Sequence, residues 1–414
     1  MKRKICFITG TRAEYGLLRQ LMLKASKDTS INFQLIVTGT HLSRSHGFTC
    51  KEIEEDGLPI SRKINLRIQG DSSQEIIDGM SRGMKGFSRA FFEQKPDLIV
   101  ILGDRYEIFS AATAAMIANI PIAHIHGGET SEGAYDEAMR HSITKMSHIH
   151  FVAAPEYKRR VNQLGEHASN IFLVGGLGID AINSIDLMSK EQLEQSLNFQ
   201  FGRRNLLVTL HPETLEKNKV IKDQVQELLL ALEEIQDTKF IFTLPNADTN
   251  NSQITKMIKK FQMKHPDSSK IFSSLGQLRY LSTLQFIDGV IGNSSSGLAE
   301  VPSFKIGTIN LGDRQKGRLK AKSIIDSSFQ KEDIVKSVKT LYTKNFQSKL
   351  KSVVNPYGKP GASNKILITL KKICLENIIK KKFYDFSGNQ YIKYIQDKHK
   401  IVIYPHYLKL IQYF

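Results

Sequence analysis

Short apolar runs rich in β-branched residues alternate along the chain with longer amphipathic segments. The short runs are typical of buried strands, and the longer segments repeat their apolar positions at helical spacing. In the first half we expect helices at Tyr15–Lys27, Gln74–Gln94 and Ile108–Ala118. The expected strands are Ile5–Thr9, Phe33–Thr38, Leu98–Leu102, Ile122–His126, Ile149–Ala153 and Ile171–Val174.

The same alternation restarts after a polar stretch, Ser189–Arg204, which we interpret as a connector. Alternating strands and helices predict parallel βαβ units, and therefore an α/β fold class with two Rossmann-like, doubly wound domains and an interdomain cleft. The strands expected here are Leu206–Leu210, Phe240–Leu244, Ile271–Ser273, Val290–Ile291 and Thr308–Asn310, and the helices are Val220–Ile235, Asn251–Lys264, Leu278–Phe286 and Ser296–Pro302.

Domain limits follow from these two series. We expect a first domain over residues 1–186, a second over 187–362 and a further helix around Ser363–Lys380. A chain of 414 residues suits two domains, because single cores stop growing at about 250–300 residues. The last segment, 387–414, is rich in Tyr, Lys and Ile and repeats no earlier unit, so we interpret it as an extension of unknown role.

Composition argues against a membrane-spanning, a disulfide-bonded and a nucleic-acid-binding protein. The apolar share is 41%, and no segment approaches the roughly 20 apolar residues of a membrane span. Cys6, Cys50 and Cys374 have neither metal-ligand nor disulfide spacing, which predicts a cytoplasmic protein. The net charge of +17 comes without a nucleic-acid-binding motif, so we expect a solvated basic surface and neither nucleic acid nor membrane as a partner.

Candidate chemistry is concentrated between Gly103 and His141. Asp104 and Arg105 follow one predicted strand, and Glu129 follows the next one after a glycine pair. In an open α/β sheet, ligands bind at these carboxyl-end turns. An aspartate here also suits a helix cap, but the adjacent arginine and the second carboxylate favour an acid–base site.

Two histidines precede the glycine pair. His124 and His126 alternate along a predicted strand, so we expect both to point to one face. We interpret His124 as a buried, hydrogen-bonded residue and His126 as the one that reaches a ligand. A metal site is not predicted, because the helical pair of histidines with a glutamate is missing.

Asp136, Glu137 and Arg140 open a predicted helix whose N-terminus should face the same cleft as Asp104. Acidic residues in the first turn of a helix often serve only to stabilise it, through their favourable interaction with the helix dipole. Two carboxylates with different pKa values are also what proton abstraction and return require, so Asp136 joins Asp104 as a candidate.

Two further turns suit an anion. After the first strand, Gly10 permits a sharp turn and Arg12 can pair with a phosphate, although a structural turn explains these residues equally well. In the second half, 292–297 places serines and glycines between a strand and a helix start, as in a pyrophosphate cradle. The alternative is a serine-rich helix cap. Glu300 lies one turn further, where it could accept hydrogen bonds from a ribose.

Together these motifs resemble the UDP-N-acetylglucosamine 2-epimerase family, specifically its hydrolysing branch, over residues 3–386. That branch releases N-acetylmannosamine, or a diacetamido relative, and UDP through a 2-acetamidoglycal, for sialic-acid-like nonulosonic acids. The implied fold is glycosyltransferase-B-like, with a last helix, about 363–386, that returns to the first domain. The motifs include TRAEYG (11–16), GDRYEI (103–108), HIHGGE (124–129), LHPET (210–214), PNAD (245–248), GNSSSG (292–297), INLGDRQKGR (309–318) and NPYG (355–358).

The resemblance also implies roles for individual residues. The catalytic candidates are Asp104, His126, Glu129 and Asp136, and UDP is implied to lie mainly against the second domain. We expect a UDP-sugar substrate, no cofactor or metal, and a homo-oligomer, either a dimer or a tetramer. The implied substrate-binding residues are Arg12, Arg105, His211, Asn246, Ser274, Ser294, Ser295, Gly297, Glu300 and Arg314.

The chain departs from the family pattern at His126, where the family commonly has a catalytic glutamate. That role falls either to His126 or to Glu129. The variant resembles UDP-N,N'-diacetylbacillosamine 2-epimerases of legionaminic acid synthesis, so the substituent on carbon 4 of the sugar stays open. Thr40 precedes His41 where the non-hydrolysing branch usually has a glutamine, which favours the hydrolysing branch.

Two other functions remain as alternatives. A glycosyltransferase of similar fold would need an acceptor to turn over its donor. A non-catalytic basic protein would show no turnover, and its affinity for nucleic acid would fall steeply with salt.

Overall fold

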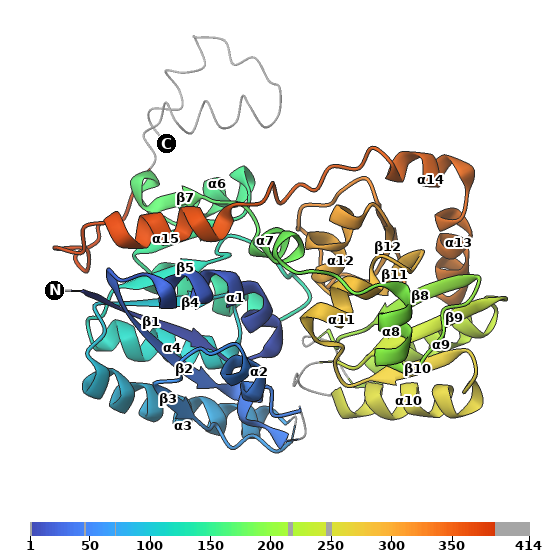
Figure 1. Cartoon of the computed structure of the whole chain (residues 1–414), viewed down its shortest axis with the longest axis horizontal. Helices are drawn as coiled ribbons and strands as arrows, with labels where there is room; N and C mark the ends of the chain where they lie inside the picture. Colours follow the sequence, from blue (N-terminus) through green and yellow to red (C-terminus); the bar gives the residue numbers. More distant parts are fainter. Residues whose placement is uncertain (1, 45–46, 71, 214–217, 246–250, 386–414) are drawn as a thin grey trace, which may run out of the picture.

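The chain forms two parallel α/β sheets that lie side by side (Figure 1), and the predicted fold class is confirmed. The computed structural model describes residues 2–44, 47–70, 72–213, 218–245 and 251–385. The predicted extension, 387–414, therefore lies outside the described residues. No helix in the described ranges is long and apolar enough to cross a membrane.

The first sheet has seven strands in the order β3-β2-β1-β4-β5-β6-β7. β1 pairs with β2 on one side and with β4 on the other, so the direction of strand succession reverses there. Such a switch point is where open α/β sheets bind ligands. The strands are β1 (Arg3–Thr9), β2 (Ile31–Thr38), β3 (Arg62–Ile64), β4 (Leu98–Leu102), β5 (Ile122–Ile125), β6 (Ile149–Val152) and β7 (Ile171–Leu173).

Helices cover both faces of this sheet (Figure 1). Alternate residues of β1 serve the two faces: Phe7 packs in the cluster that contains Leu18 of α1, and Ile8 in the one that contains Phe87 of α3. Each fully buried side chain of this size contributes roughly 1.5–3 kcal/mol. The elements are α1 (Arg12–Lys27), η1 (Gly39–Leu42), α2 (Cys50–Glu55), α3 (Ser73–Gln94), α4 (Tyr106–Ile117), α5 (Asp136–Met146), α6 (Pro155–Gln163), η3 (Ala168–Asn170) and α7 (Leu177–Ser184).

The second sheet has six strands in the order β10-β9-β8-β11-β12-β13, with its switch point between β8 and β11. Its strands are β8 (Arg204–Thr209), β9 (Thr238–Thr243), β10 (Ser269–Phe272), β11 (Gly289–Gly292), β12 (Gly307–Leu311) and β13 (Ile324–Ser327). Its helices are α8 (Lys190–Leu197), α9 (Asn218–Glu233), α10 (Asn251–Lys264), α11 (Gly276–Thr283), α12 (Ser296–Ala299), η4 (Val301–Phe304), α13 (Lys331–Leu341) and α14 (Lys344–Leu350).

After the second sheet, the chain crosses back and α15 (Ala362–Lys372) packs on the first one (Figure 1). Asp180 of α7 accepts hydrogen bonds from the backbone N–H groups of Gly361, Ala362 and Ser363, and so caps the start of α15. The helix is shorter than expected, because Ile373 takes an extended conformation and Asn377 has a φ of 57°.

The sequence analysis did not name several elements, among them α2, α6, α7, α13, α14 and the three short elements α8, β3 and β13. The supposed connector contains α8, which begins with a capping box between Ser189 and Gln192 and buries Leu193 and Leu197 one turn apart. The edge strands β3 and β13 are three and four residues long, with few buried positions. Such short edge strands lack the longer buried apolar runs that mark the inner strands.

Candidate active site

The motifs from the sequence lie at both switch points. The turns after β1 and β4 carry Arg12 and Asp104, and those after β8 and β11 carry His211 and Ser294. The two edges touch: a Cβ added at Gly133 of the first domain would lie 3.0 Å from the Cα of Arg314 in the second. The candidate site therefore lies where both carboxyl edges meet.

Arg140 of α5 gathers the acidic groups of the first edge. Its guanidinium pairs with Asp104 and lies 2.9 Å from Glu137 Oε2. It also donates to the backbone oxygen of Glu129 at 3.0 Å and to Ser131 Oγ at 2.8 Å. Arg140 is only 1% exposed, so these contacts replace its hydration. Sequence reasoning placed Arg140 on this helix without giving it a role; nothing in its spacing indicates four converging acceptors.

His126 lies just beyond β5 and has a φ of 66°. The expectation that His124 and His126 share a strand face is therefore wrong, because the strand ends between them. A left-handed histidine is uncommon and costs free energy unless its surroundings hold it. Here its Nδ1 lies 3.1 Å from Glu129 Oε1, and its Nε2 accepts from the backbone N–H of Leu177 at 3.5 Å.

Glu129 is buried between Arg318 and His126. Its Oε2 lies 3.3 Å from Arg318 Nη1, in the second domain, and its Oε1 faces His126. Burial by itself would raise the pKa of Glu129, but Arg318 and His126 outweigh that effect and lower it. Glu129 is thus an ionised carboxylate in contact with a histidine.

The other two acidic candidates lie at helix starts. Gly103 has a φ of 80° after β4, and Asp104 follows it, before Arg105 caps α4. Arg105 donates from Nε to Glu107 Oε1 at 2.9 Å. Asp136 is the first residue of α5, the helix that also carries Arg140.

Two histidines near this edge are buried and neutral. His124 bonds to Thr144 Oγ1 at 3.1 Å and to the backbone oxygen of Gly103 at 2.8 Å, as the sequence analysis expected. His41 bonds to Thr9 and Thr49 through their hydroxyls. Burial lowers the pKa of each histidine to about 3, so both act as structural residues.

Two buried carboxyl groups meet at the turn after β1, Glu14 of α1 and Glu107 of α4. Glu14 accepts from the backbone N–H groups of Gly10 and Thr11 at 2.7 and 3.3 Å. Burial and the neighbouring Glu107 raise the pKa of Glu14 to about 8. A Cβ on Gly10 would lie 2.4 Å from Glu107 Cγ, which explains why glycine is needed here. In front of this pair, Arg12 forms a two-point contact with Glu52.

On the second edge, a neutral amide holds the His211 turn. The Asn293 side chain accepts from the backbone N–H of His211 at 2.7 Å and donates to its backbone oxygen at 2.8 Å. Asn293 is fully buried. Its backbone oxygen accepts from Arg314 Nη1 at 3.2 Å, so Asn293 links two predicted binding residues.

The serine-rich turn follows β11. Ser294 precedes Ser295, the N-cap of α12, and Gly297 is buried against Thr308. Glu300 bonds with Ser296 and reaches the first domain, since a Cβ on Gly178 would lie 2.9 Å from Glu300 Cγ. Burial raises the pKa of Glu300.

Ser274 lies after the edge strand β10 and accepts from the backbone N–H of Gly276 at 3.4 Å. A Cβ on Gly276 would lie 2.0 Å from Arg12 Nη2, so this turn packs on the first domain. Asn246 lies outside the described residues. The structure brings His126, Glu129 and Asp104 together around Arg140, whereas Arg12, Arg105 and Arg314 each lie on a different turn.

Sequence reasoning missed Glu213, which links two turns of the second edge, and Arg318, which joins the two edges. Glu213 accepts from the backbone N–H groups of Asp313 and Arg314 at 3.0 and 3.1 Å. Arg318 contacts Glu129 in the other domain. Both lie in motifs that the analysis quoted, LHPET and GDRQKGR, but pairing across 100 or more residues leaves no periodic signal.

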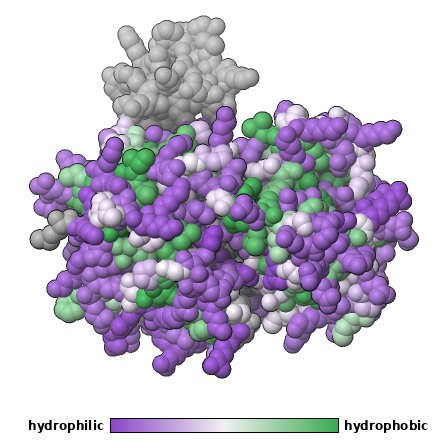
Figure 2. All heavy atoms as spheres, in the orientation of Figure 1, coloured by the Kyte–Doolittle hydropathy of each residue, from purple (hydrophilic) through white to green (hydrophobic). Residues whose placement is uncertain are grey.

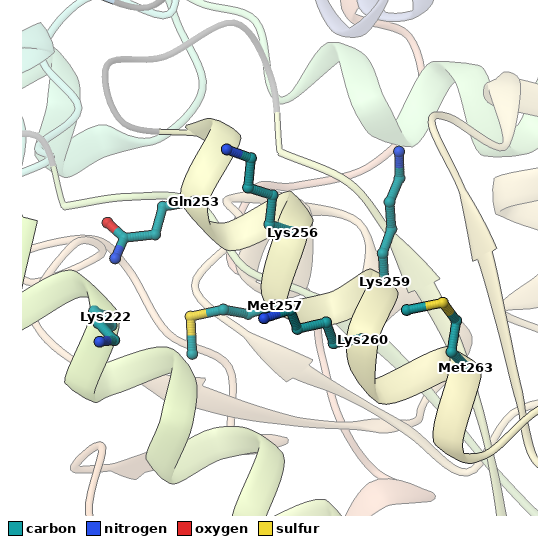
Figure 3. A pocket seen from close by; sticks show the side chains of 7 residues that line it. All are labelled: Lys222, Gln253, Lys256, Met257, Lys259, Lys260 and Met263. Carbon is teal, nitrogen blue, oxygen red and sulfur yellow. The ribbon is translucent and has the colours of Figure 1, made fainter.

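A surface hollow of about 280 Å³ lies away from this site, between α9 and α10 (Figure 3). Lys222 lines it from α9, and the α10 residues include Lys256, Lys259 and Lys260. None of its lining residues belongs to a strand-end turn. Hydrophilic residues also cover most of the face seen in Figure 2, as the expected solvated surface requires.

No group of three or more histidine, cysteine, aspartate or glutamate residues within the described ranges is arranged to hold a metal ion.

Comparisons with known proteins agree on one family. The family model described as UDP-N-acetylglucosamine 2-epimerase matches residues 23–371. The chain is 40% identical to GDP/UDP-N,N'-diacetylbacillosamine 2-epimerase (hydrolyzing) of Campylobacter jejuni, over 93% of this chain and 99% of that one. It is also 40% identical to polysialic acid biosynthesis protein P7 of Escherichia coli, over 92% and 97% of the two chains.

A solved structure shares the fold. UDP-GlcNAc 2-epimerase from Neisseria meningitidis, bound to UDP-GlcNAc, superposes with a TM-score of 0.75 at 18% identity. The match covers 89% of this chain and all of that one.

Proposed function

Because the chain belongs to the UDP-N-acetylglucosamine 2-epimerase family, we propose that it is a hydrolysing 2-epimerase that converts UDP-N-acetylglucosamine and water into N-acetylmannosamine and UDP. One observation carries the proposal at the level of the site. Asp104 and the Glu129 loop converge on the buried Arg140 at the first switch point, opposite the serine-rich turn of the second domain.

The proposed reaction has two steps. A base removes the proton from carbon 2 of the sugar, the electron pair forms the double bond between carbons 1 and 2, and the bond from carbon 1 to UDP breaks. Water then adds its oxygen to carbon 1 of the 2-acetamidoglycal, while carbon 2 regains a proton on the opposite face. Asp104, Asp136 and either His126 or Glu129 are the acid–base candidates.

Binding of UDP is assigned mainly to the second domain. His211 and Asn246 are proposed to contact the nucleotide, Ser294, Ser295 and Gly297 the phosphates, and Glu300 the ribose. The buried clamp of Asn293 on the His211 turn supports this role, because it holds the turn before a ligand arrives. Arg12, Arg105, Ser274 and Arg314 are proposed to complete the site, with the arginines neutralising the leaving pyrophosphate.

UDP-N,N'-diacetylbacillosamine is the second candidate substrate. The Campylobacter jejuni relative named for this activity is 40% identical to the chain. The reacting carbons are the same in both sugars, so the substituent on carbon 4 is the difference that the site has to read. The free 2-epimer of N,N'-diacetylbacillosamine would be a precursor of legionaminic acid, whereas N-acetylmannosamine would be a precursor of sialic acid.

A proton NMR time course in deuterated buffer tests the proposal with both sugars in parallel. We expect free 2-epimer and UDP, with deuterium on carbon 2, and the faster substrate identifies the carbon-4 substituent. An acceptor-dependent product without free amino sugar would replace the epimerase by a glycosyltransferase. No turnover of either sugar would contradict the proposed activity.

We also propose that the chain forms a homo-oligomer through α3. Ile77, Met84 and Phe92 are exposed large hydrophobic residues about two helical turns apart, so they share one face, and Phe92 is 80% exposed. Phe92→Glu should reduce the mass measured by light scattering to that of a monomer, 46.8 kDa. Val354→Glu, at an exposed residue far along the chain, is the control. An unchanged mass for Phe92→Glu would remove α3 from the interface.

A further inference from the structure

Arg318 lies in the loop between β12 and β13 of the second sheet, yet its side chain ends in the first domain. Its Nη1 lies 3.3 Å from Glu129 Oε2, its Nε donates to the backbone oxygen of Thr130 at 2.6 Å, and its Nη2 donates to Ser131 Oγ at 3.4 Å. The side chains of Arg318 and Glu129 are only 9% and 5% exposed. This is a three-point contact with little water around it.

The other carboxylate oxygen of Glu129 lies beside His126. Because the backbone N–H of Leu177 can only donate, His126 Nε2 is the acceptor and Nδ1 carries the proton that faces Glu129. Arg318, Glu129 and His126 thus form a chain of cation, carboxylate and imidazole. A carboxylate beside Nδ1 fixes the orientation of the ring.

The loop that carries Arg318 is also attached to the proposed pyrophosphate site. Arg314, four residues earlier, donates to the backbone oxygen of Asn293 at 3.2 Å. Thr130 of the first domain donates to the backbone oxygen of Lys316 at 3.2 Å. Gly317 has a φ of 79°, and a Cβ there would lie 2.7 Å from Thr130 Oγ1, so the two loops are in close contact.

We propose that Arg318 is a positioning residue that reaches from the second domain and aligns Glu129 and His126 for proton transfer. The proposal rests on the proposed function. A cation supplied by one domain to the acid–base pair of the other makes the reactive arrangement depend on the contact between the two domains. A group that only fastened the domains together would instead affect stability and nucleotide binding.

The charge balance at Glu129 sets the expected pH dependence. Arg318 and His126 favour its ionised form, and burial opposes it. Removing Arg318 therefore raises the pKa of Glu129 and moves the acidic limb of the kcat profile to higher pH. The titratable or charged groups that face Glu129 are Arg318, His126, His124, Arg140, Tyr157 and Tyr357.

The test compares Arg318→Gln and Arg318→Lys with Lys316→Gln, a matched control on the same loop whose side chain is 60% exposed. We expect Arg318→Gln to lower kcat about 100-fold and to shift the acidic limb upward, with UDP affinity by calorimetry nearly unchanged. Arg318→Lys should recover part of the rate, because it restores the charge but not the three-point contact. Lys316→Gln should behave as the wild type.

Thermal unfolding provides a measurement that does not need turnover. Arg318→Gln leaves Glu129 as a buried, poorly paired charge, so adding Glu129→Gln should recover much of the lost melting temperature. Additive losses in the double variant would contradict the contact. Equal losses of UDP affinity and rate, with an unmoved pH profile, would reduce Arg318 to a structural tie. Wild-type protein that releases no UDP from either sugar would overturn the proposed function itself, whatever the variants do.

Discussion

The two carboxyl edges that meet at the candidate site are built from different kinds of groups. The first edge is charged: Arg140 joins Asp104 and Glu137, and Glu129 lies between His126 and Arg318. Charged groups held in place with little water are suited to moving protons.

The second edge carries the charged residues Glu213, Glu300, Arg314 and Arg318, and adds neutral groups to them. The Asn293 amide holds the His211 turn, and Ser294, Ser295 and Gly297 present hydroxyl and backbone groups at the start of α12. Such groups hold a phosphate without changing their own charge. In the proposed function the two edges divide the work, with proton transfer on the first edge and nucleotide binding mainly on the second.

The largest effect is expected from Asp104→Asn on the charged edge. It keeps the shape of the side chain but removes its charge, so kcat should fall by about 10²–10⁴ while UDP affinity stays nearly unchanged. Steady-state rates and calorimetry measure the two quantities. Asp78→Asn, on the exposed face of α3, is the control. A full-speed Asp104→Asn enzyme would remove Asp104 from the catalytic residues.

On the second edge, Ser295→Ala and Glu300→Ala should act on binding. Each loses about one hydrogen bond to the substrate, so KM should rise about tenfold, the equivalent of ~1.4 kcal/mol, with a smaller change in kcat. If KM stays constant in both variants, the serine-rich turn is only a helix cap. If kcat falls more than KM rises, the division between the edges is wrong.

The buried carboxyl pair behind the first edge predicts a pH-dependent stability. The folded pKa of Glu14 is about 8, above its ordinary value of 4.5. Between these values the folded state keeps a proton that the unfolded state has lost, so stability falls as pH rises from about 4.5 to about 8. Glu14→Gln removes this dependence, so its melting temperature relative to wild type should increase across that range. If the difference in melting temperature between Glu14→Gln and the wild type does not change with pH, a group other than Glu14 holds the proton.

The smallest effect is expected from removing 387–414, because every residue assigned to either edge precedes this segment. Rates with UDP-N-acetylglucosamine should match those of the full chain. A lost activity would mean that the two edges are not sufficient by themselves.

The repeated alternation of apolar runs and amphipathic segments was enough to predict the two doubly wound domains, and the motifs were enough to predict the family and an epimerase activity; all three predictions are confirmed. Candidate site residues could also be predicted where a strand is followed directly by a helix, as at Asp104 and in the serine-rich turn. The roles given to these residues stay predictions, as do the cytoplasmic location and the oligomeric state.

Several of the elements that were missed have weak local patterns. β3 and β13 are short edge strands, and α8 lies in a polar stretch although its Ser189 and Gln192 form a capping box. The amphipathic helix α13, which buries Ile334 and Val338, was also missed. The direction of His126 also depended on where β5 ends, which its neighbours in the sequence do not reveal.

The sequence by itself determined the kinds of groups at each turn, because a strand followed by glycine, a charged residue and a helix is a local arrangement. Only the tertiary structure decided their partners. Arg140 meets Asp104 from 36 residues away, Asn293 meets His211 from 82, and Arg318 reaches Glu129 in the other domain. Such pairs form because two sheets place their carboxyl edges against each other, and contacts between distant segments leave no periodic trace along the chain.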